Sequence, residues 1–203
     1  MKNNFKSQTL FFNNYFDNMK KLIDKLDQKK LINISNFLEK SIYQRKNIFV
    51  AGNGGSASVA NHFLCDFNKG IKISSKYKML PKVYSLNNSI ELITAISNDI
   101  NYENVFDFQL ENYANRGDLL FVFSCSGTSK NILNLIKLAK KKKLEVIYIT
   151  GFLHKKFKTK IKFHINLDCE NYGITEDMFS TFMHLISQWI RFKSSNYNKN
   201  KIL

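Results

Sequence analysis

The sequence predicts an α/β fold in which a parallel β-sheet is covered by helices on both faces. Short segments that are apolar almost throughout alternate along the chain with segments of helical periodicity. Strands of this kind are buried on both faces, as in parallel sheets. Two loops rich in glycine or serine each follow such a strand and precede a helix. Because ligands of these sheets bind at the carboxyl ends of the strands, we expect the functional site there.

Residues 1–45 are expected to form two helices that act as an oligomerisation arm. Apolar residues recur at steps of three and four over residues 10–26 and again over residues 30–43, which is the periodicity of a helix with one apolar face. We expect both helices to pack on a partner subunit as well as on their own core. The apolar positions of the first helix are Phe12, Phe16, Met19, Leu22, Ile23 and Leu26.

The rest of the chain predicts one domain over residues 46–193 and a flexible basic tail over residues 194–203. A single proline and the lack of a long linker argue against a second domain. The expected strands are residues 47–51, 82–86, 119–123, 145–149 and 162–167. The expected helices are residues 56–67, 90–96, 103–113, 130–141 and 174–192.

The chain carries a formal net charge of +15, from 31 Lys+Arg against 16 Asp+Glu. A basic chain can bind nucleic acid or an anionic membrane surface. Here the basic residues are mostly lysines scattered over expected helix faces and loops, which is typical of a solvated surface. We therefore expect neither nucleic acid nor a membrane as a partner, although the charge would help to attract an anionic substrate. The hydrophobic fraction of 44% excludes global disorder.

The three cysteines, Cys65, Cys125 and Cys169, form no Cys-x-x-Cys pair and indicate no disulfide framework. The N-terminus lacks the apolar stretch of a signal peptide, and no run of about 18 apolar residues is present that would cross a membrane. These features favour a protein of the reducing cytoplasm. His154 and His164 are interpreted as a surface residue and a strand residue.

Residues 124–129, Ser-Cys-Ser-Gly-Thr-Ser, directly follow one expected strand and precede an expected helix. The first amides of a helix lack internal partners and carry partial positive charge, so they attract anions. Gly127 permits a tight turn, and the neighbouring hydroxyls can donate hydrogen bonds to phosphate oxygens. The helix N-terminus could make Cys125 reactive, but a passive place in the ligand site is the favoured interpretation. An ordinary turn with a serine N-cap is the alternative for the whole loop.

Residues 52–56, Gly-Asn-Gly-Gly-Ser, form a second candidate phosphate loop. Three glycines in four residues require positive φ angles or a ligand pressed against the backbone. The loop is not a Walker motif, because no Gly-Lys-Ser/Thr follows, and its glycine spacing is not that of the dinucleotide pattern. A plain tight turn is the alternative.

Two pairs of ionisable residues lie on the helices beside these loops. His62 and Asp66 are four residues apart and therefore share a helix face. Glu176 and His184 are eight residues, or two turns, apart on the last helix. Together the pairs could hold a divalent metal such as zinc, or they could supply a general base and acid for proton transfer. Each pair alone is more often a surface or capping arrangement.

Taken together, the motifs resemble the phosphoheptose isomerases of the sugar isomerase (SIS) family. The resemblance implies an SIS-type three-layer sandwich, in which helices flank a central parallel sheet of five strands and an N-terminal helical arm is added. It extends from about residue 10 to residue 192. It rests on residues 51–58 followed by 62–66, on 97–99 with 102–106, on the Ser-x-Ser-Gly-x-Ser pattern of 124–129, and on 171–177 with His184.

The resemblance implies an aldose–ketose isomerase that converts sedoheptulose 7-phosphate to D-glycero-D-manno-heptose 7-phosphate through an enediol(ate). The product would feed heptose precursors of lipopolysaccharide, capsule or other surface glycans. The family further implies one zinc ion, Zn(2+), per subunit and a homotetramer with active sites at subunit interfaces. A non-catalytic SIS module that binds a sugar phosphate or a protein partner is the alternative. The presence of both His/carboxylate pairs favours the enzyme.

The resemblance also implies a role for individual residues. Asp66 and His184 would be the catalytic base and acid. The zinc ligands would be His62, Asp66, Glu176 and His184. The substrate contacts would come from Asn53, Gly54, Gly55, Ser56, Asn98, Asp99, Ser124, Cys125, Ser126, Ser129 and Glu176.

Two positions depart from the family pattern. Cys125 stands where a hydroxyl residue is usual, and Asp66 stands where the family usually has a glutamate. Glu176 occupies a position at which glutamine or glutamate is found. Since aspartate is one methylene shorter than glutamate and catalytic geometry is strict, a helical shift or a water would have to restore its reach. A different substrate is the other explanation of this change.

Overall fold

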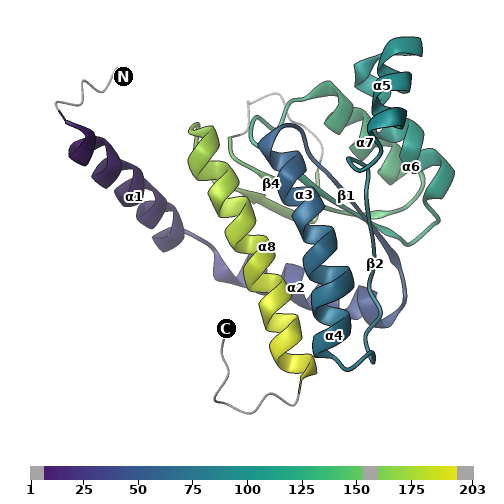
Figure 1. Ribbon diagram of the computed structural model, residues 1–203, viewed down its shortest axis with the longest axis horizontal. Coiled ribbons are helices and arrows are strands. Elements are labelled where there is room, and N and C mark those ends of the chain that lie inside the picture. The colour runs from purple at the N-terminus through teal and green to yellow at the C-terminus, as the bar shows by residue number, and fades with distance from the viewer. Residues whose placement is uncertain (1–6, 153–159, 196–203) are drawn as a thin grey trace.

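The computed structural model describes residues 7–152 and 160–195. His154 and the predicted tail from residue 196 onward lie outside the described residues. The sequence forms a three-layer α/β structure, in which a central sheet lies between two layers of helices (Figure 1). Within the described residues, no helix combines the length and the apolar character needed to cross a membrane.

The central sheet contains five parallel strands in the order β2-β1-β3-β4-β5. Its strands are β1 (Asn47–Ala51), β2 (Lys82–Ser85), β3 (Leu119–Ser124), β4 (Glu145–Thr150) and β5 (Phe163–Asn166). Each strand lies within one residue of its predicted bounds. The sheet is therefore the one that the apolar segments predicted.

The side chains of the central strand β3 explain why both faces of the sheet are covered. Phe121 and Phe123 point into one layer of the core, whereas Leu120 and Val122 point into the other, as expected for a strand whose side chains alternate. All four side chains are fully buried. An apolar strand of this kind requires a helical layer on each side.

The two helical layers come from different parts of the chain. One face of the sheet is covered by α2 (Gln28–Tyr43), α3 (Gly55–Cys65) and α8 (Tyr172–Ser194). The opposite face is covered by α5 (Ile90–Asp99), α6 (Asp107–Tyr113) and α7 (Lys130–Lys141). Helix α8 begins two residues before its predicted start, because the Asn171 side chain accepts a hydrogen bond from the Ile174 backbone N–H over 3.1 Å and caps the helix.

The first helix, α1 (Gln8–Asp24), projects from the body of the molecule (Figure 1). It buries no side chain and exposes Leu10, Phe11, Phe12 and Phe16. Helix α2 differs, because its apolar face packs on the sheet within the core. Only the first of the two predicted arm helices therefore projects, and Met19 and Leu22 of this helix still pack against the core.

Two predicted helices have a different local form. The helix predicted over residues 56–67 continues beyond α3 as a π-helix, η1 (Asp66–Ile71), and a short turn, α4 (Lys72–Ser74). The helix predicted over residues 103–113 is divided into a 3-10 turn, η2 (Tyr102–Asn104), and α6. A new helix starts there because the Asp107 carboxylate accepts hydrogen bonds from the Asn104 side chain and the Phe108 N–H, over 2.9 and 3.1 Å.

Candidate active site

The glycine loop and the serine loop lie side by side at the carboxyl edge of the sheet. They follow β1 and β3, which are parallel neighbours with Ala51 opposite Val122. The Ser56 hydroxyl at the start of α3 lies 3.7 Å from the Cys125 thiol in the serine loop. The structure thus brings the two predicted phosphate loops together.

The glycine loop leaves the start of α3 open to an anion. Gly54 is the N-cap residue and has a φ angle of +57°, a conformation that favours glycine. Since glycine has no side chain, no side-chain hydrogen bond caps the helix. The first amides of α3 are therefore able to bind phosphate oxygens.

The serine loop uses two of its hydroxyls to hold its own shape. The Ser124 Oγ accepts a hydrogen bond from the Gly127 N–H over 3.2 Å, and the Ser126 Oγ accepts one from the Thr128 N–H over 3.3 Å. Accepting its bond leaves the Ser126 hydroxyl proton free to be donated, whereas the Ser124 hydroxyl also forms a hydrogen bond with the Tyr148 side chain. Ser129 is the N-cap of α7 but makes no capping side-chain hydrogen bond, so the plain serine-cap interpretation does not describe this loop.

The Cys125 side chain is buried at the point where the serine loop meets the start of α3. Burial raises the pKa of its thiol to about 11, and the nearby Glu176 carboxylate also raises it, whereas a hydrogen bond with Ser56 lowers it. Because the thiolate is the reactive form of cysteine, this side chain stays neutral and unreactive at ordinary pH. The environment supports the passive interpretation of Cys125.

The Glu176 carboxylate lies against the glycine loop. It accepts a hydrogen bond from the Cys125 thiol over 3.7 Å. It also fills the space next to the Gly55 Cα, so that any side chain at position 55 would collide with it. This contact gives a steric reason for glycine at the second residue of the Gly54-Gly55 pair.

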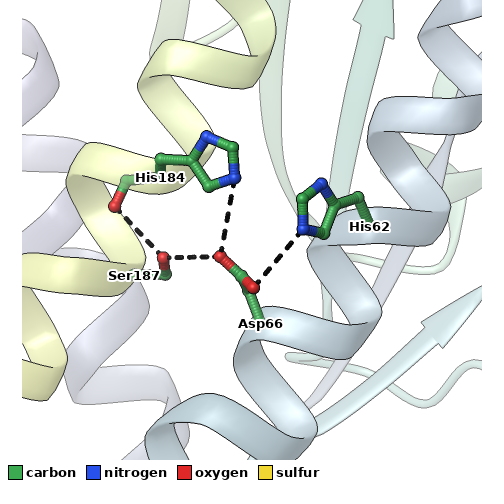
Figure 2. A network of polar contacts seen from close by, with 4 residues as sticks. All are labelled: His62, Asp66, His184 and Ser187. Carbon is green, nitrogen blue, oxygen red and sulfur yellow. Dashed lines mark hydrogen bonds and ion pairs between the residues drawn. The ribbon is translucent and has the colours of Figure 1, made fainter. Parts of the chain in front are cut away.

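Three of the four predicted metal ligands converge on one point between α3 and α8 (Figure 2). The Asp66 Oδ1 lies 3.6 Å from His62 Nε2, and its Oδ2 lies 3.9 Å from His184 Nε2. The two imidazole rings meet edge to face, with centroids 4.9 Å apart. The Asp66 side chain is 19% exposed, whereas those of His62 and His184 are 51% and 39% exposed, so Asp66 is the most buried of the three.

Glu176 is not part of this group. It is eight residues from His184, a separation of about 12 Å along a helix. The separation along α8 directs the two side chains to different places, one to the glycine loop and the other to Asp66. This geometry therefore does not support the prediction that Glu176 is the fourth metal ligand.

Ser187 contacts the group and was missed by the sequence analysis. Its hydroxyl lies 3.1 Å from Asp66 Oδ2 and also 3.1 Å from the backbone carbonyl of His184 (Figure 2). The spacing of three residues between His184 and Ser187 is a helical signal that they share a face. Asp66 itself is the first residue of the π-helix η1, and such turns occur frequently at functional sites.

The chemistry of the three side chains fits a metal ion. Their candidate ligand atoms all lie within 4.8 Å of one another. Two histidines and one carboxylate are a ligand set of catalytic zinc sites, in which a fourth position stays open. Ligands about 2.1 Å from an ion are about 3.4 Å apart in a tetrahedral arrangement, so the observed spacing requires only small movements.

The remaining predicted residues, Asn98 and Asp99, lie at the end of α5. The Asn98 side chain donates to Asp99 Oδ1 over 2.8 Å, and in the described part of the chain no hydrogen bond joins either side chain to the other candidate residues. The turn η2 that follows does reach the glycine loop, since the Tyr102 hydroxyl donates to Asn53 Oδ1 over 3.0 Å. Asn98 and Asp99 are therefore followed directly by a turn that contacts the glycine loop.

Comparisons with known proteins agree with this architecture. Residues 14–151 match the family described as SIS domain. A probable phosphoheptose isomerase from Thermoplasma acidophilum is 33% identical over 165 residues, 81% of this chain and 89% of that protein. A phosphoheptose isomerase from Aliarcobacter butzleri is 31% identical over 163 residues, 80% of this chain and 85% of that protein.

Solved structures share the fold at lower sequence identity. The phosphoheptose isomerase from Neisseria gonorrhoeae superimposes with a TM-score of 0.78 at 22% identity, over 90% of this chain and 95% of that one. The enzyme from Francisella tularensis gives a TM-score of 0.76 at 20% identity, over 91% and 96%. These likenesses concern the fold.

Proposed function

This chain belongs to the phosphoheptose isomerases of the SIS domain family, and we propose that it interconverts sedoheptulose 7-phosphate and D-glycero-D-manno-heptose 7-phosphate. One observation of the site carries this proposal. The Asp66 carboxylate lies between two histidines, 3.6 Å and 3.9 Å away, on the helices beside the two phosphate loops. A non-catalytic binding module has no need of such a group.

The phosphate of the substrate binds at the carboxyl edge of β1 and β3. The hydroxyls of Ser56, Ser124, Ser126 and Ser129 donate to its oxygens, together with the free amides at the start of α3 and α7. Support comes from the uncapped Gly54 start of α3 and from the Ser126 hydroxyl proton, which remains available because Ser126 Oγ acts as an acceptor within the loop. Asn53, Asn98 and Asp99 contact the sugar.

The isomerisation requires one base and one acid. Asp66 removes the proton from carbon 1 of the ketose, and His184 donates a proton to the carbonyl oxygen on carbon 2, which gives the enediol. Asp66 then returns its proton to carbon 2, and the hydroxyl on carbon 1 gives up its proton to His184. These roles are supported by the 3.9 Å between Asp66 Oδ2 and His184 Nε2, which would bring the base and the acid within reach of neighbouring substrate atoms.

We propose that His62, Asp66 and His184 hold one zinc ion per subunit. A bound zinc ion would polarise the substrate oxygens and orient them. The three side chains supply two neutral nitrogen ligands and one negative oxygen ligand, which suits this metal. Since each histidine binds through Nε2 in this arrangement, the protons on the Nδ1 atoms remain available for hydrogen bonds.

We further propose that the protein assembles as a homotetramer with active sites at subunit interfaces. Exposed apolar side chains support this assembly, on α1 at Leu10, Phe11, Phe12 and Phe16 and on α8 at Leu185, Trp189 and Phe192. Surfaces of this kind typically mark protein–protein contacts. We place the enzyme in the cytoplasm, where its product feeds the heptose of surface glycans.

The proposal is tested by incubating the purified chain with sedoheptulose 7-phosphate, with and without added zinc, and by following the aldose product. We expect turnover that increases with zinc, and we expect Asp66→Asn to lose it. The exposed Asp24, at the end of α1, provides a control through Asp24→Asn, which removes the same charge away from the site. A wild-type chain that binds the sugar phosphate but never isomerises it would instead support the binding module.

A further inference from the structure

The amide side chain of Asn53 is held by two residues from other segments. Asn53 and Asn131 form a reciprocal pair, in which each Nδ2 donates to the Oδ1 of the other over 2.9 Å. The Tyr102 hydroxyl donates to the same Asn53 Oδ1 over 3.0 Å. Asn131 is only 2% exposed, so the pair lies at the buried end of the glycine loop.

A backbone amide determines which way both side chains face. The Ile132 N–H donates to Asn131 Oδ1 over 2.9 Å. A backbone N–H can only donate, so this atom of Asn131 must be the oxygen. The Asn131 Nδ2 then points to Asn53, and the atom of Asn53 that receives this bond must also be an oxygen. The orientation of Asn53 thus follows from the start of α7.

In this arrangement one N–H group of the Asn53 side chain remains able to donate a hydrogen bond. Its Oδ1 accepts from both Asn131 and Tyr102, and one of its two N–H groups is donated to Asn131. Within residues 7–152 and 160–195, the second N–H has no hydrogen-bond partner. Asn53 therefore offers a donor to a ligand and has no free acceptor.

The same contacts join three segments at the proposed substrate site. Asn53 belongs to the glycine loop, Asn131 to the first turn of α7, and Tyr102 to the turn that follows Asp99. Two further bonds fix that turn to α7. Lys130 pairs with the Glu103 carboxylate over 2.6 Å, and the Asn134 side chain donates to the Glu103 carbonyl over 3.1 Å.

We infer that Asn131 and Tyr102 are positioning residues that hold the Asn53 amide with an N–H directed to a sugar oxygen of the phosphosugar substrate. The inference rests on the proposed function, since it names how that site recognises the sugar. It assigns a role to two residues that the sequence motifs alone did not. The recognised group is an oxygen that accepts a hydrogen bond.

The first test uses Asn131→Asp, which keeps the shape of the side chain and replaces its donor by an oxygen. The Asn53 Oδ1 would then face a carboxylate oxygen in place of its donor, and rotation of the amide would only bring it against the other carboxylate oxygen, so the N–H would no longer be held toward the substrate. We expect KM to rise roughly tenfold, the effect of one lost hydrogen bond, with a smaller change in kcat. Asn112→Asp, on the exposed surface of α6, introduces the same charge away from Asn53 and from the turn that carries Tyr102, and it should leave KM near the wild-type value.

The second test is a double-mutant cycle that does not alter the core. Tyr102 is largely exposed, so Tyr102→Phe removes one hydrogen bond without a risk to folding. If Tyr102 acts through Asn53, Tyr102→Phe weakens binding of sedoheptulose 7-phosphate in the wild type and has no effect in the Asn53→Ala background. Calorimetry supplies the dissociation constants, and the melting temperature reports any structural loss separately.

The outcomes separate this inference from the proposed function. Equal losses from Tyr102→Phe in both backgrounds, or an unchanged dissociation constant in Asn53→Ala, would overturn the positioning role even if the enzyme is active. A wild-type chain that binds the sugar phosphate without turnover would overturn the isomerase, while the cycle would still decide the inference through binding. A chain that binds no sugar phosphate would contradict both.

Discussion

The hydroxyl of Ser187 lies 3.1 Å from Asp66 Oδ2, so that a hydrogen bond joins α8 to the first residue of the π-helix η1. Asp66 is one methylene shorter than the glutamate that is usual at this position in the phosphoheptose isomerases. The π-helical turn and this hydrogen bond together account for how a short side chain is held between two histidines.

Ser187→Ala should weaken zinc binding. The hydroxyl contacts the carboxylate that we propose as a metal ligand, and the loss of such a partner typically lowers metal affinity about 10- to 100-fold. Competition with a chelating dye measures this affinity directly. Ser180→Ala, on the same helix, should change nothing, and Ser187→Thr should retain most of the affinity. Equal affinity of the wild type and Ser187→Ala would remove Ser187 from this role.

Ser126→Ala should raise KM for the phosphosugar with a smaller effect on kcat. The hydroxyl is expected to bind the phosphate in the ground state and in the transition state alike, and losses of this type appear in KM. A rise of roughly tenfold corresponds to one hydrogen bond to a charged group. Steady-state kinetics measures it, with the exposed Ser58→Ala as control. An unaltered KM would argue against the phosphate assignment.

Gly55→Ala should destabilise the protein, because the new methyl group collides with the Glu176 carboxylate. Because the colliding atoms are the end of a flexible side chain that can turn away, the cost should lie below the roughly 1–3 kcal/mol of an overpacked core. Thermal unfolding should show a lower melting temperature for Gly55→Ala and a partial recovery for Gly55→Ala combined with Glu176→Ala. If the second change brought no recovery, Glu176 would not be the group that requires glycine here.

Cys125 should resist alkylation at pH 8 while the exposed Cys65 reacts. The pKa of the Cys125 thiol is raised from 9.0 to about 11, first by burial, so almost no thiolate forms at this pH. The unfolded chain loses this proton near pH 9, before the folded chain does. The contribution of Cys125 to stability therefore falls as the pH rises from about 9 to 11.

Mass spectrometry after brief treatment with iodoacetamide resolves the two sites. The Cys125 reaction should accelerate as the pH is raised toward 11. Similar rates for the two thiols at pH 8 would show that Cys125 is activated, contrary to its environment.

The sheet could be predicted because its signal is local. A strand such as β3, with Phe121 and Phe123 on one face and Leu120 and Val122 on the other, is apolar at every position. Helix α7 begins and ends at the predicted residues, because its apolar face repeats regularly and lysines end it. The positions of the two predicted phosphate loops could be predicted as well, because each loop directly follows one of these apolar strands.

The rest of the site depends on contacts between distant segments. No local pattern indicates that Glu176 turns toward Gly55 instead of Asp66, because the choice is made by packing of α8 against α3. The π-helix at Asp66 likewise has no signal in the side-chain spacing. The bond between Asn53 and Asn131 joins residues 78 positions apart, so it became visible only in the fold.

The central claim is that Asp66 moves a proton between two carbons of a phosphosugar. The direct measurement is the reaction of zinc-supplied protein with sedoheptulose 7-phosphate in deuterated water, followed by nuclear magnetic resonance. We predict an aldose product that carries deuterium on carbon 2 in the fraction of turnovers in which the proton on Asp66 exchanges with solvent before its return, and a loss of roughly 100-fold or more in Asp66→Asn, as expected for removal of a general base. Wild-type turnover by Asp66→Asn, or no aldose from the wild type, would contradict the claim.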